Sequence, residues 1–292
     1  MADAAPSRPL ARLRLGDREF ELGRRTLVAG ILNCTPDSFF DGGLHAGPRE
    51  AVARYHQMAE EGADWIDLGG ESTRPGAEPV PALEEWRRVE PVCAAARRAG
   101  HPLPLSIDTT KAEVAERALD AGAAIVNDVS ALRFDPRLAA LAARYRAGLI
   151  LMHMRGEPRS MQREPRYGDV VAEVRDELAA ALRAAAGRGV DEARVVIDPG
   201  IGFGKTVAHN LEILRRLGEF SLLGRPVMVG CSRKSFIGAV CDAPPPERLE
   251  GTLAAHVAAA LAGAHVVRVH DVAAHRRALA LADALLGGPP ES

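Results

Sequence analysis

The sequence predicts a single-domain α/β protein of the (β/α)₈ class, the TIM barrel. From Thr26 almost to the end of the chain, short aliphatic runs alternate with longer amphipathic or alanine-rich segments. Eight such runs, each followed by a segment suited to a helix, fill roughly 250 residues, which is the usual size of a closed barrel. A doubly wound open sheet is the alternative, but the number and even spacing of the runs favour closure.

The predicted strands are short, and Gly, Pro, Asp or Asn flanks each of them, as is typical of buried parallel strands. They cover residues 27–32, 65–68, 103–107, 124–127, 148–152, 194–197, 226–229 and 266–269. The segments between them are long enough for crossover helices. The clearest helical segments, with a last one near the end of the chain, cover residues 49–62, 83–99, 111–121, 136–145, 169–187, 247–263 and 276–286.

A β-hairpin is predicted before the barrel. Residues 12–15 and 19–22 flank Gly16 and Asp17, a pair that favours a tight turn. We expect this hairpin to close the floor of the barrel. The predicted organisation is therefore an N-terminal tail and hairpin (1–25), one barrel (26–287) and a short C-terminal tail (288–292).

The composition excludes some classes of partner. A formal net charge of -2 offers no broad basic surface for nucleic acid or an anionic membrane. No run approaches the roughly 20 apolar residues that cross a bilayer, and residues 1–14 lack the apolar core of a signal peptide. Cys34, Cys93, Cys231 and Cys241 lack zinc-site spacing, so reduced thiols are expected. We expect a soluble, cytoplasmic protein.

Polar residues gather where the predicted strands end. Active sites of TIM barrels lie at the C-terminal ends of the strands, and the opposite loops, such as 98–100 and 187–189, show plain turn chemistry. The polar segments are NCTPDSFFDGG (33–43), GGESTRPG (69–76), Asp108, Asn127 with Asp128, MHM (152–154), DPGIGFGK (198–205), SRKS (232–235) and RVHD (268–271). One end of the barrel is therefore predicted to bind a ligand.

Three of these residues suggest the kind of ligand. Asp108, Asn127 and Asp198 follow strands three, four and six, and short acceptor and amide groups at one level of a barrel suit a flat heterocycle with donors and acceptors. A metal site is an alternative, but no histidine joins them in ligand spacing. Helix capping is another, since each of the three precedes a predicted helix. Their common level favours binding.

A second set of residues favours an anion. Thr73, Arg74, Arg268 and His270 place cationic and hydroxyl donors at the rim, as a diphosphate requires. SRKS opens a helix, whose free N–H groups attract anions. The chain has only three lysines, of which Lys234 lies in this helix start. We expect Lys205 to brace its glycine loop and Lys111 to be structural.

Five segments in order resemble the signatures of the dihydropteroate synthases. They are GILNCTPDSF (30–39), GGESTRPG (69–76), DPGIGFGK (198–205), GCSRKS (230–235) and RVHDV (268–272). The resemblance runs from the first barrel strand to the last. It implies a TIM barrel that holds a pterin deep in the barrel and 4-aminobenzoate near the surface.

The resemblance also implies roles for individual residues. Asp108, Asp198, Lys234 and Arg268 are the expected catalytic residues, with Arg268 stacking on the pterin ring. The implied contacts are Asp108, Asn127, Asp198, Lys234 and Arg268 with the pterin; Thr73, Arg268 and His270 with the diphosphate; Phe39, Arg74, Pro75, Phe203 and Ser235 with 4-aminobenzoate; and Asn33 with Mg²⁺.

The implied reaction joins dihydropterin diphosphate to 4-aminobenzoate and releases pyrophosphate, giving dihydropteroate. The diphosphate departs, the pterin methylene carries positive charge, and the arylamine attacks it without a covalent enzyme intermediate. The loops after strands one and two are expected to act as mobile lids, and a homodimer through the late helices is implied. The alternatives are a folate-dependent corrinoid methyltransferase, which has no use for a diphosphate rim, and a pterin-binding paralogue without synthase activity.

Overall fold

The eight barrel strands form one parallel sheet that closes on itself. The computed structural model describes residues 8–35, 47–73, 76–100 and 103–287. Neighbouring strands follow the order β8-β7-β6-β5-β4-β3-β10-β9, and a parallel bridge between Ile197 and Val227 joins the two outer strands. The predicted barrel is therefore confirmed and the open sheet is wrong. The strands are β3 (Leu27–Asn33), β4 (Trp65–Gly69), β5 (Leu105–Asp108), β6 (Ile125–Asp128), β7 (Gly148–Met152), β8 (Val195–Asp198), β9 (Met228–Val229) and β10 (Val266–Val269).

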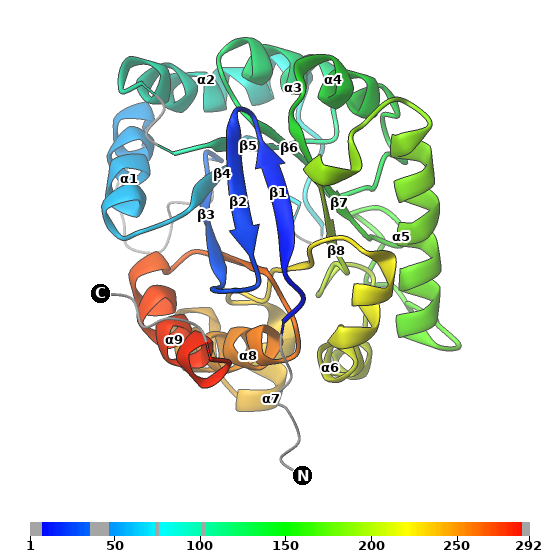
Figure 1. Cartoon of the computed structure of the whole chain (residues 1–292). Coiled ribbons are helices and arrows are strands. Elements are labelled where there is room, and N and C mark those ends of the chain that lie inside the picture. Colours follow the sequence, from blue (N-terminus) through cyan, green and yellow to red (C-terminus); the bar gives the residue numbers. More distant parts are fainter. Residues whose placement is uncertain (1–7, 36–46, 74–75, 101–102, 288–292) are drawn as a thin grey trace.

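Helices surround the ring of strands (Figure 1). They are α1 (Pro48–Glu60), α2 (Ala82–Arg98), α3 (Ala112–Asp120), α4 (Arg137–Tyr145), α5 (Val170–Ala186), α6 (Val207–Arg215), α7 (Ser235–Cys241), α8 (Leu249–Leu261) and α9 (Val272–Leu285), with 3₁₀ turns η2 (Glu192–Arg194), η3 (Leu217–Leu223) and η4 (Pro245–Glu247). Within the described ranges, no helix has both the length and the apolar character that crossing a membrane requires.

The structure corrects some predicted boundaries. β9 begins at Met228 rather than 226, and β5 begins at Leu105 rather than 103. A proline precedes the start of each strand, at 226 and 104, and proline has no N–H for the ladder. α9 begins at Val272, four residues before the predicted start. α6, which the sequence did not single out, follows the N-cap Thr206.

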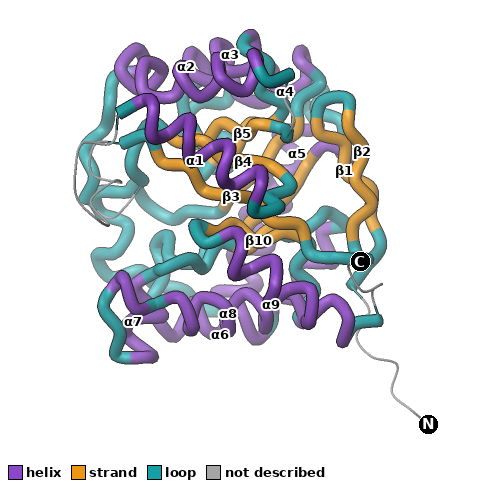
Figure 2. The backbone as a smooth tube through the Cα atoms, turned by 90° about the vertical axis from the view of Figure 1, so that its left-hand side faces the viewer, coloured by secondary structure: helices purple, strands orange, loops and turns teal. Residues whose placement is uncertain are grey.

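The hairpin is present and closes the barrel floor. β1 (Ala11–Leu15) and β2 (Arg18–Leu22) pair antiparallel. Leu13, Leu15 and Leu22 are buried, and a Cβ on Gly148 would lie 2.5 Å from Leu15 Cδ2. The hairpin lies across the ring of strands in Figure 1 and at one end of the barrel in Figure 2. The domain limits at 26 and 287 stay a prediction.

An apolar layer fills the barrel interior above the hairpin. It comprises Leu27, Ala29, Trp65, Ile125, Ile150, Val196, Met228 and Val266, which cluster with the three hairpin leucines. Side chains two positions apart on a strand point to the same face. The residue two positions after each of these therefore also points inward, one level nearer the C-terminal end of the strands.

Candidate active site

A polar layer lies directly above the apolar one. Two positions after Trp65, Ile125, Val196 and Val266 come Asp67, Asn127, Asp198 and Arg268. Asp108 is paired with Asn127 in the register of β5 and β6. All four of the carboxylate and amide side chains belong to buried residues. Because side chains alternate along a strand, the inward-pointing position is apolar at one level and polar at the next level toward the C-terminal end of the strands.

Arg268 joins two of the carboxylates. Its Nε donates to Asp67 Oδ2 at 2.5 Å, and its Nη2 donates to Asp108 Oδ2 at 2.6 Å. Asn127 Nδ2 also donates to Asp67 Oδ2, at 2.9 Å. Two buried acceptors in this cluster, Asp67 Oδ1 and Asn127 Oδ1, have no hydrogen-bond partner among the described residues. Since unpaired buried acceptors are unfavourable, a ligand with N–H donors would stabilise this layer.

The charges of the cluster respond to its burial. Burial raises the pKa of Asp108 to about 7, against the opposing effect of Arg268 and with a further rise from Asp67. The pKa of Arg268 is raised above its usual value, because the Asp67 and Asp108 carboxylates outweigh the effect of its own burial. Asp108 is therefore a carboxyl group that changes charge near neutral pH, next to a guanidinium that stays charged.

Asp198, which ends β8, and Lys234, which follows β9, form a second group of charges. Asp198 Oδ1 accepts a 2.7 Å hydrogen bond from the Gly200 N–H. Lys234 Nζ donates to the Ile201 carbonyl and lies 4.6 Å from the centre of the Phe203 ring. Burial lowers the pKa of Lys234 to about 8, although Asp198 opposes the shift. Burial has the opposite effect on the carboxylic acid: it raises the pKa of Asp198, and the positive charge of Lys234 opposes this shift.

The loops after β9 and β10 meet at the rim. The Ser232 hydroxyl lies 2.8 Å from His270 Nδ1, and Arg233 Nη2 donates to Asp271 Oδ1 at 2.8 Å. Helix α7 begins at Ser235, and Lys234 occupies its N-cap. The hydroxyl and imidazole groups of these loops therefore lie together at the rim, as expected for an anion site.

The structure settles several sequence interpretations. Helix capping by Asp108, Asn127 and Asp198 is wrong, since Asp108 and Asn127 bind side chains of other strands and Asp198 binds a turn N–H. Lys205 braces its glycine loop, because its buried Nζ donates to the Phe203 carbonyl at 3.0 Å. Lys111 is structural and pairs with Glu71 and Glu85 at 2.8 and 2.5 Å.

Several other expected site residues lie around this centre. Asn33 ends β3, and a Cβ on Gly69 would lie 3.5 Å from its Oδ1. Thr73 is half-buried in the loop after β4, and Ser235 is exposed at the start of α7. Phe39, Arg74 and Pro75 lie outside the described residues. No group of three His, Cys, Asp or Glu side chains suited to a metal occurs within the described ranges.

Asp67 is the site residue that sequence reasoning missed. It lies in the middle of a buried strand and is 1 % exposed. A signal was present, because Asp67 follows Trp65 by two positions and so shares its inward direction. A charged residue at an inward position of a barrel strand is expected only with a partner or a ligand.

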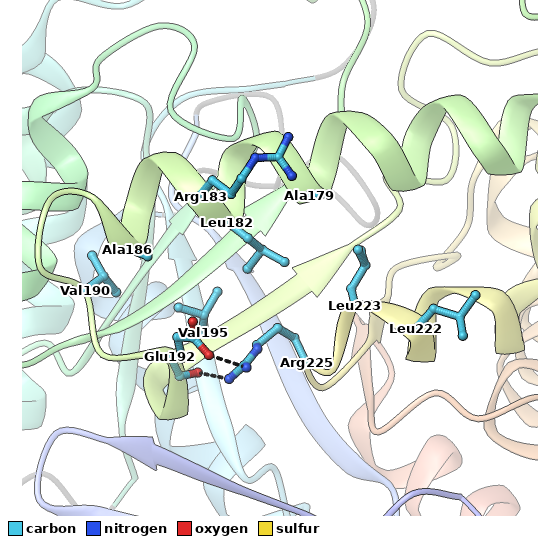
Figure 3. A pocket seen from close by; sticks show the side chains of 10 residues that line it. All are labelled: Ala179, Leu182, Arg183, Ala186, Val190, Glu192, Val195, Leu222, Leu223 and Arg225. Carbon is cyan, nitrogen blue, oxygen red and sulfur yellow. Dashed lines mark hydrogen bonds and ion pairs between the residues drawn. The ribbon is translucent and has the colours of Figure 1, made fainter.

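A separate cavity lies away from this centre (Figure 3). It has a volume of about 280 Å³, and its lining includes Leu182 of α5 and Leu223 of η3. Its Arg225 donates to the Glu192 side chain at 2.5 Å, before β8 and β9 begin. The cavity therefore lies toward the N-terminal side of the strands, where the loops of a TIM barrel contribute to stability rather than catalysis.

The fold and the site together define a barrel enzyme that binds a pterin. The family model described as pterin binding enzyme matches residues 29–270. A dihydropteroate synthase of Synechocystis sp. is 48% identical over 274 residues, covering 94% of this chain and 94% of the relative. The chain belongs to the dihydropteroate synthase family.

Solved structures agree with this assignment. A Xanthomonas albilineans dihydropteroate synthase with 4-aminobenzoic acid has a TM-score of 0.88 and 46% identity, covering 96% of this chain and 100% of that one. A Yersinia pestis dihydropteroate synthase in complex with a sulfonamide drug has a TM-score of 0.89 and 38% identity, covering 95% and 100%.

Proposed function

We propose that the polar layer binds the pterin ring of dihydropterin diphosphate and that this barrel end transfers the pterinylmethyl group to 4-aminobenzoate. The observation that carries the assignment is the set Asp67, Asp108 and Asn127, held around Arg268 above an apolar floor. Within the part of the chain that the structure describes, two of its acceptors are buried without partners. A pterin supplies ring and exocyclic N–H donors, which match unpaired acceptors in a flat, deep site.

The residues then divide the work of the reaction. The methylene carbon–oxygen bond breaks, and its electron pair leaves with the diphosphate. Asp108 as a carboxylate favours the electron-poor pterin, while Arg268 and His270 supply positive charge or N–H donors at the diphosphate end. The amine nitrogen of 4-aminobenzoate bonds to the methylene carbon and loses a proton. No covalent bond to the enzyme forms during these steps.

We propose Asn33 as the protein ligand of a Mg²⁺ ion that accompanies the diphosphate. Mg²⁺ is usually bound by few protein oxygens, several waters and substrate phosphates. Asn33, at the end of β3, offers a single amide oxygen, which fits that pattern. When bound, the ion would neutralise charge on the departing diphosphate.

The remaining contacts, the location and the assembly are also part of the proposal. Phe203 and Ser235 are proposed to line the 4-aminobenzoate pocket together with Phe39, Arg74 and Pro75, and Thr73 to contact the diphosphate. A cytoplasmic homodimer is proposed, and the exposed leucines Leu261, Leu281 and Leu285 on the late helices are consistent with an interface there.

The decisive experiment measures pyrophosphate release from dihydropterin diphosphate and Mg²⁺, with and without 4-aminobenzoate. We expect release that depends on 4-aminobenzoate, yields dihydropteroate, stops with a chelator and is inhibited competitively by a sulfonamide. Asp108→Asn should reduce kcat/KM by about 100-fold, or roughly 2.7 kcal/mol. Tight pterin binding without product would contradict the synthase and indicate the silent paralogue.

A further inference from the structure

The β9 loop, residues 230–234, has a backbone that the chain does not adopt readily. Arg233 has φ 56°, in the left-handed region that favours glycine. This conformation is unfavourable for a residue with a side chain, so surrounding groups must hold it. Ser232, which bonds to His270 at the rim, and Lys234 lie on either side of this residue.

Helix α8 and its N-cap residue supply those groups through one row of side chains. Arg248, Thr252 and His256 are spaced by four residues and so lie on one face. Arg248 Nη1 donates to the Arg233 carbonyl at 3.0 Å, and the Arg233 N–H donates to Thr252 Oγ1 at 3.1 Å. The Cys231 N–H donates to His256 Nε2 at 2.9 Å. The row therefore fixes the loop through its backbone.

His256 extends this row to the neighbouring loop. Its Nδ1 lies 2.9 Å from Nε2 of His275 in α9, and His275 Nδ1 lies 2.7 Å from the Asp271 carbonyl. Both rings are fully buried. The partners determine where the protons lie. The Asp271 carbonyl can only accept, so His275 Nδ1 carries a proton and donates. The Cys231 N–H can only donate, so His256 Nε2 is unprotonated and accepts. His256 Nδ1–H then donates to His275 Nε2, and both rings are neutral.

The pair His256–His275 connects the β9 loop to the β10 loop, residues 270–271, from within the protein core. At one end it binds the residue before Ser232, and at the other it binds the residue after His270. Ser232 and His270 also bond to each other at the rim. The two loops are thus joined at the rim, by this bond and by Arg233 with Asp271, and a second time in the core by the two histidines.

We propose that His256 and His275 are positioning residues that hold the β9 and β10 loops in the geometry that binds the substrate diphosphate. The inference rests on the proposed function and deepens it. Lys234 has separate anchors at Ile201 and Phe203. Loss of the histidine pair should therefore affect the diphosphate more than the pterin ring.

The test compares two ligands by calorimetry with the full chain and Mg²⁺. One is dihydropterin diphosphate, and the other is the same pterin with a hydroxymethyl group and no diphosphate. The Kd of the hydroxymethylpterin divided by the Kd of the diphosphate measures the contribution of the diphosphate group to binding. In His256→Phe, which leaves the Cys231 N–H without its acceptor, we expect this ratio to fall about tenfold while hydroxymethylpterin affinity stays within about threefold. His256→Gln, whose amide oxygen can accept from Cys231, should recover part of the loss.

His265 provides the matched control. It is also buried, accepts from the Val227 N–H at 3.2 Å and lies 2.9 Å from the Pro9 carbonyl, at the opposite end of the strands. His265→Phe should lower the unfolding temperature as His256→Phe does, but leave the Kd ratio unchanged. If His256→Phe folds poorly, His275→Asn replaces it, because its amide still donates to Asp271 but cannot reach His256. A smaller fall of the ratio is then expected.

The outcomes distinguish the proposed function from the positioning role. If the wild-type chain binds both ligands equally, the proposed function fails and this inference fails with it. If the wild-type chain prefers the diphosphate and the histidine variants keep that preference, only the positioning role is overturned. A parallel loss of affinity for both ligands would also overturn it.

Discussion

Asp67 determines where the guanidinium of Arg268 lies. The two residues are 201 positions apart in the chain, and their strands, β4 and β10, are separated in the sheet by β3. Asp67 also accepts a hydrogen bond from the side-chain amide of Asn127. One carboxylate therefore orients two of the groups proposed to contact the pterin, and it does so from a fully buried position.

Asp67→Asn should accordingly impair binding more than folding. The substitution leaves Arg268 with one carboxylate instead of two and removes a buried negative charge. We expect kcat/KM for dihydropterin diphosphate to fall by about 100-fold, since the guanidinium of Arg268 and the amide of Asn127 lose the carboxylate that orients them. Steady-state kinetics on the purified variant checks this.

Asp64→Asn is the matched control for Asp67→Asn. Asp64 precedes the same strand, is buried, and pairs with Arg25 at 2.5 Å and Arg276 at 2.6 Å at the floor end of the barrel. It should lower the urea midpoint and leave kcat/KM within about threefold, because it lies away from the polar layer. Equal kinetic losses in the two variants would contradict a specific role for Asp67.

The pH dependence of kcat/KM should be bell-shaped. Asp108 acts as a carboxylate, and burial raises its pKa to about 7, so activity should rise as the pH passes that value. Lys234 acts as an ammonium, and burial lowers its pKa to about 8, so activity should fall above that value. The alkaline limb should move upward in Lys234→Arg, because a guanidinium stays charged. An unmoved limb would exclude Lys234 as its origin.

The glycine loop after β8 depends on close backbone packing. Gly200 has φ 68°, and a Cβ there would lie 1.8 Å from the His153 carbonyl oxygen. This contact sets the loop against the end of β7, where the buried Lys205 Nζ also lies 2.9 Å from His153 Nδ1. The loop can therefore present Ile201 and Phe203 to Lys234 only if residue 200 has no side chain.

Gly200→Ala should destabilise the protein by about 3 kcal/mol or more, because backbone atoms must move to relieve the overlap. Gly76→Ala is its comparison. Gly76 has φ 84°, but a Cβ there would meet no described atom within 4 Å, so only the cost of the left-handed backbone, about 1 kcal/mol, is expected. Urea unfolding of both variants measures the difference. Similar losses would show that conformation, not overlap, constrains Gly200.

The whole molecule separates stability from function between the two ends of the barrel. The hairpin leucines and the apolar layer fill the floor, while the polar layer and the rim loops occupy the other end. The apolar layer lies between the hairpin and the polar layer and so separates the two ends. Substitutions at the floor should therefore change the free energy of unfolding without changing the reaction.

Leu15→Ala tests this separation. Leu15 is 1 % exposed, and removing its side chain should cost about 3 kcal/mol, with kcat/KM unchanged. Leu10→Ala, at a side chain that is 73 % exposed, should cost less than about 0.5 kcal/mol. Chemical denaturation and steady-state kinetics on the same preparations give both quantities. A large loss of kcat/KM in folded Leu15→Ala would mean that the two ends are coupled.

The amino-acid sequence by itself determined the strands, the hairpin and the end of the barrel that carries the site. These features follow from local rules: aliphatic runs with Gly, Pro or Asp at their ends form buried strands, and polar residues after parallel strands meet at one edge. Asp108, Asn127, Asp198 and Lys234 could be selected because each lies at or just beyond a predicted strand end. The short α6 was missed.

Only the tertiary structure decided which of these residues touch. The pairing of Arg268 with Asp67 depends on closure of the ring, which brings the last strand beside the first. The neutral pair His256–His275 and the contacts of α8 with Arg233 depend on how the last helices pack against the rim loops. Such contacts join side chains of different elements, and no periodicity of the sequence records them. Local patterns specify the direction in which a side chain points, whereas its partner is specified by the packing of the whole barrel.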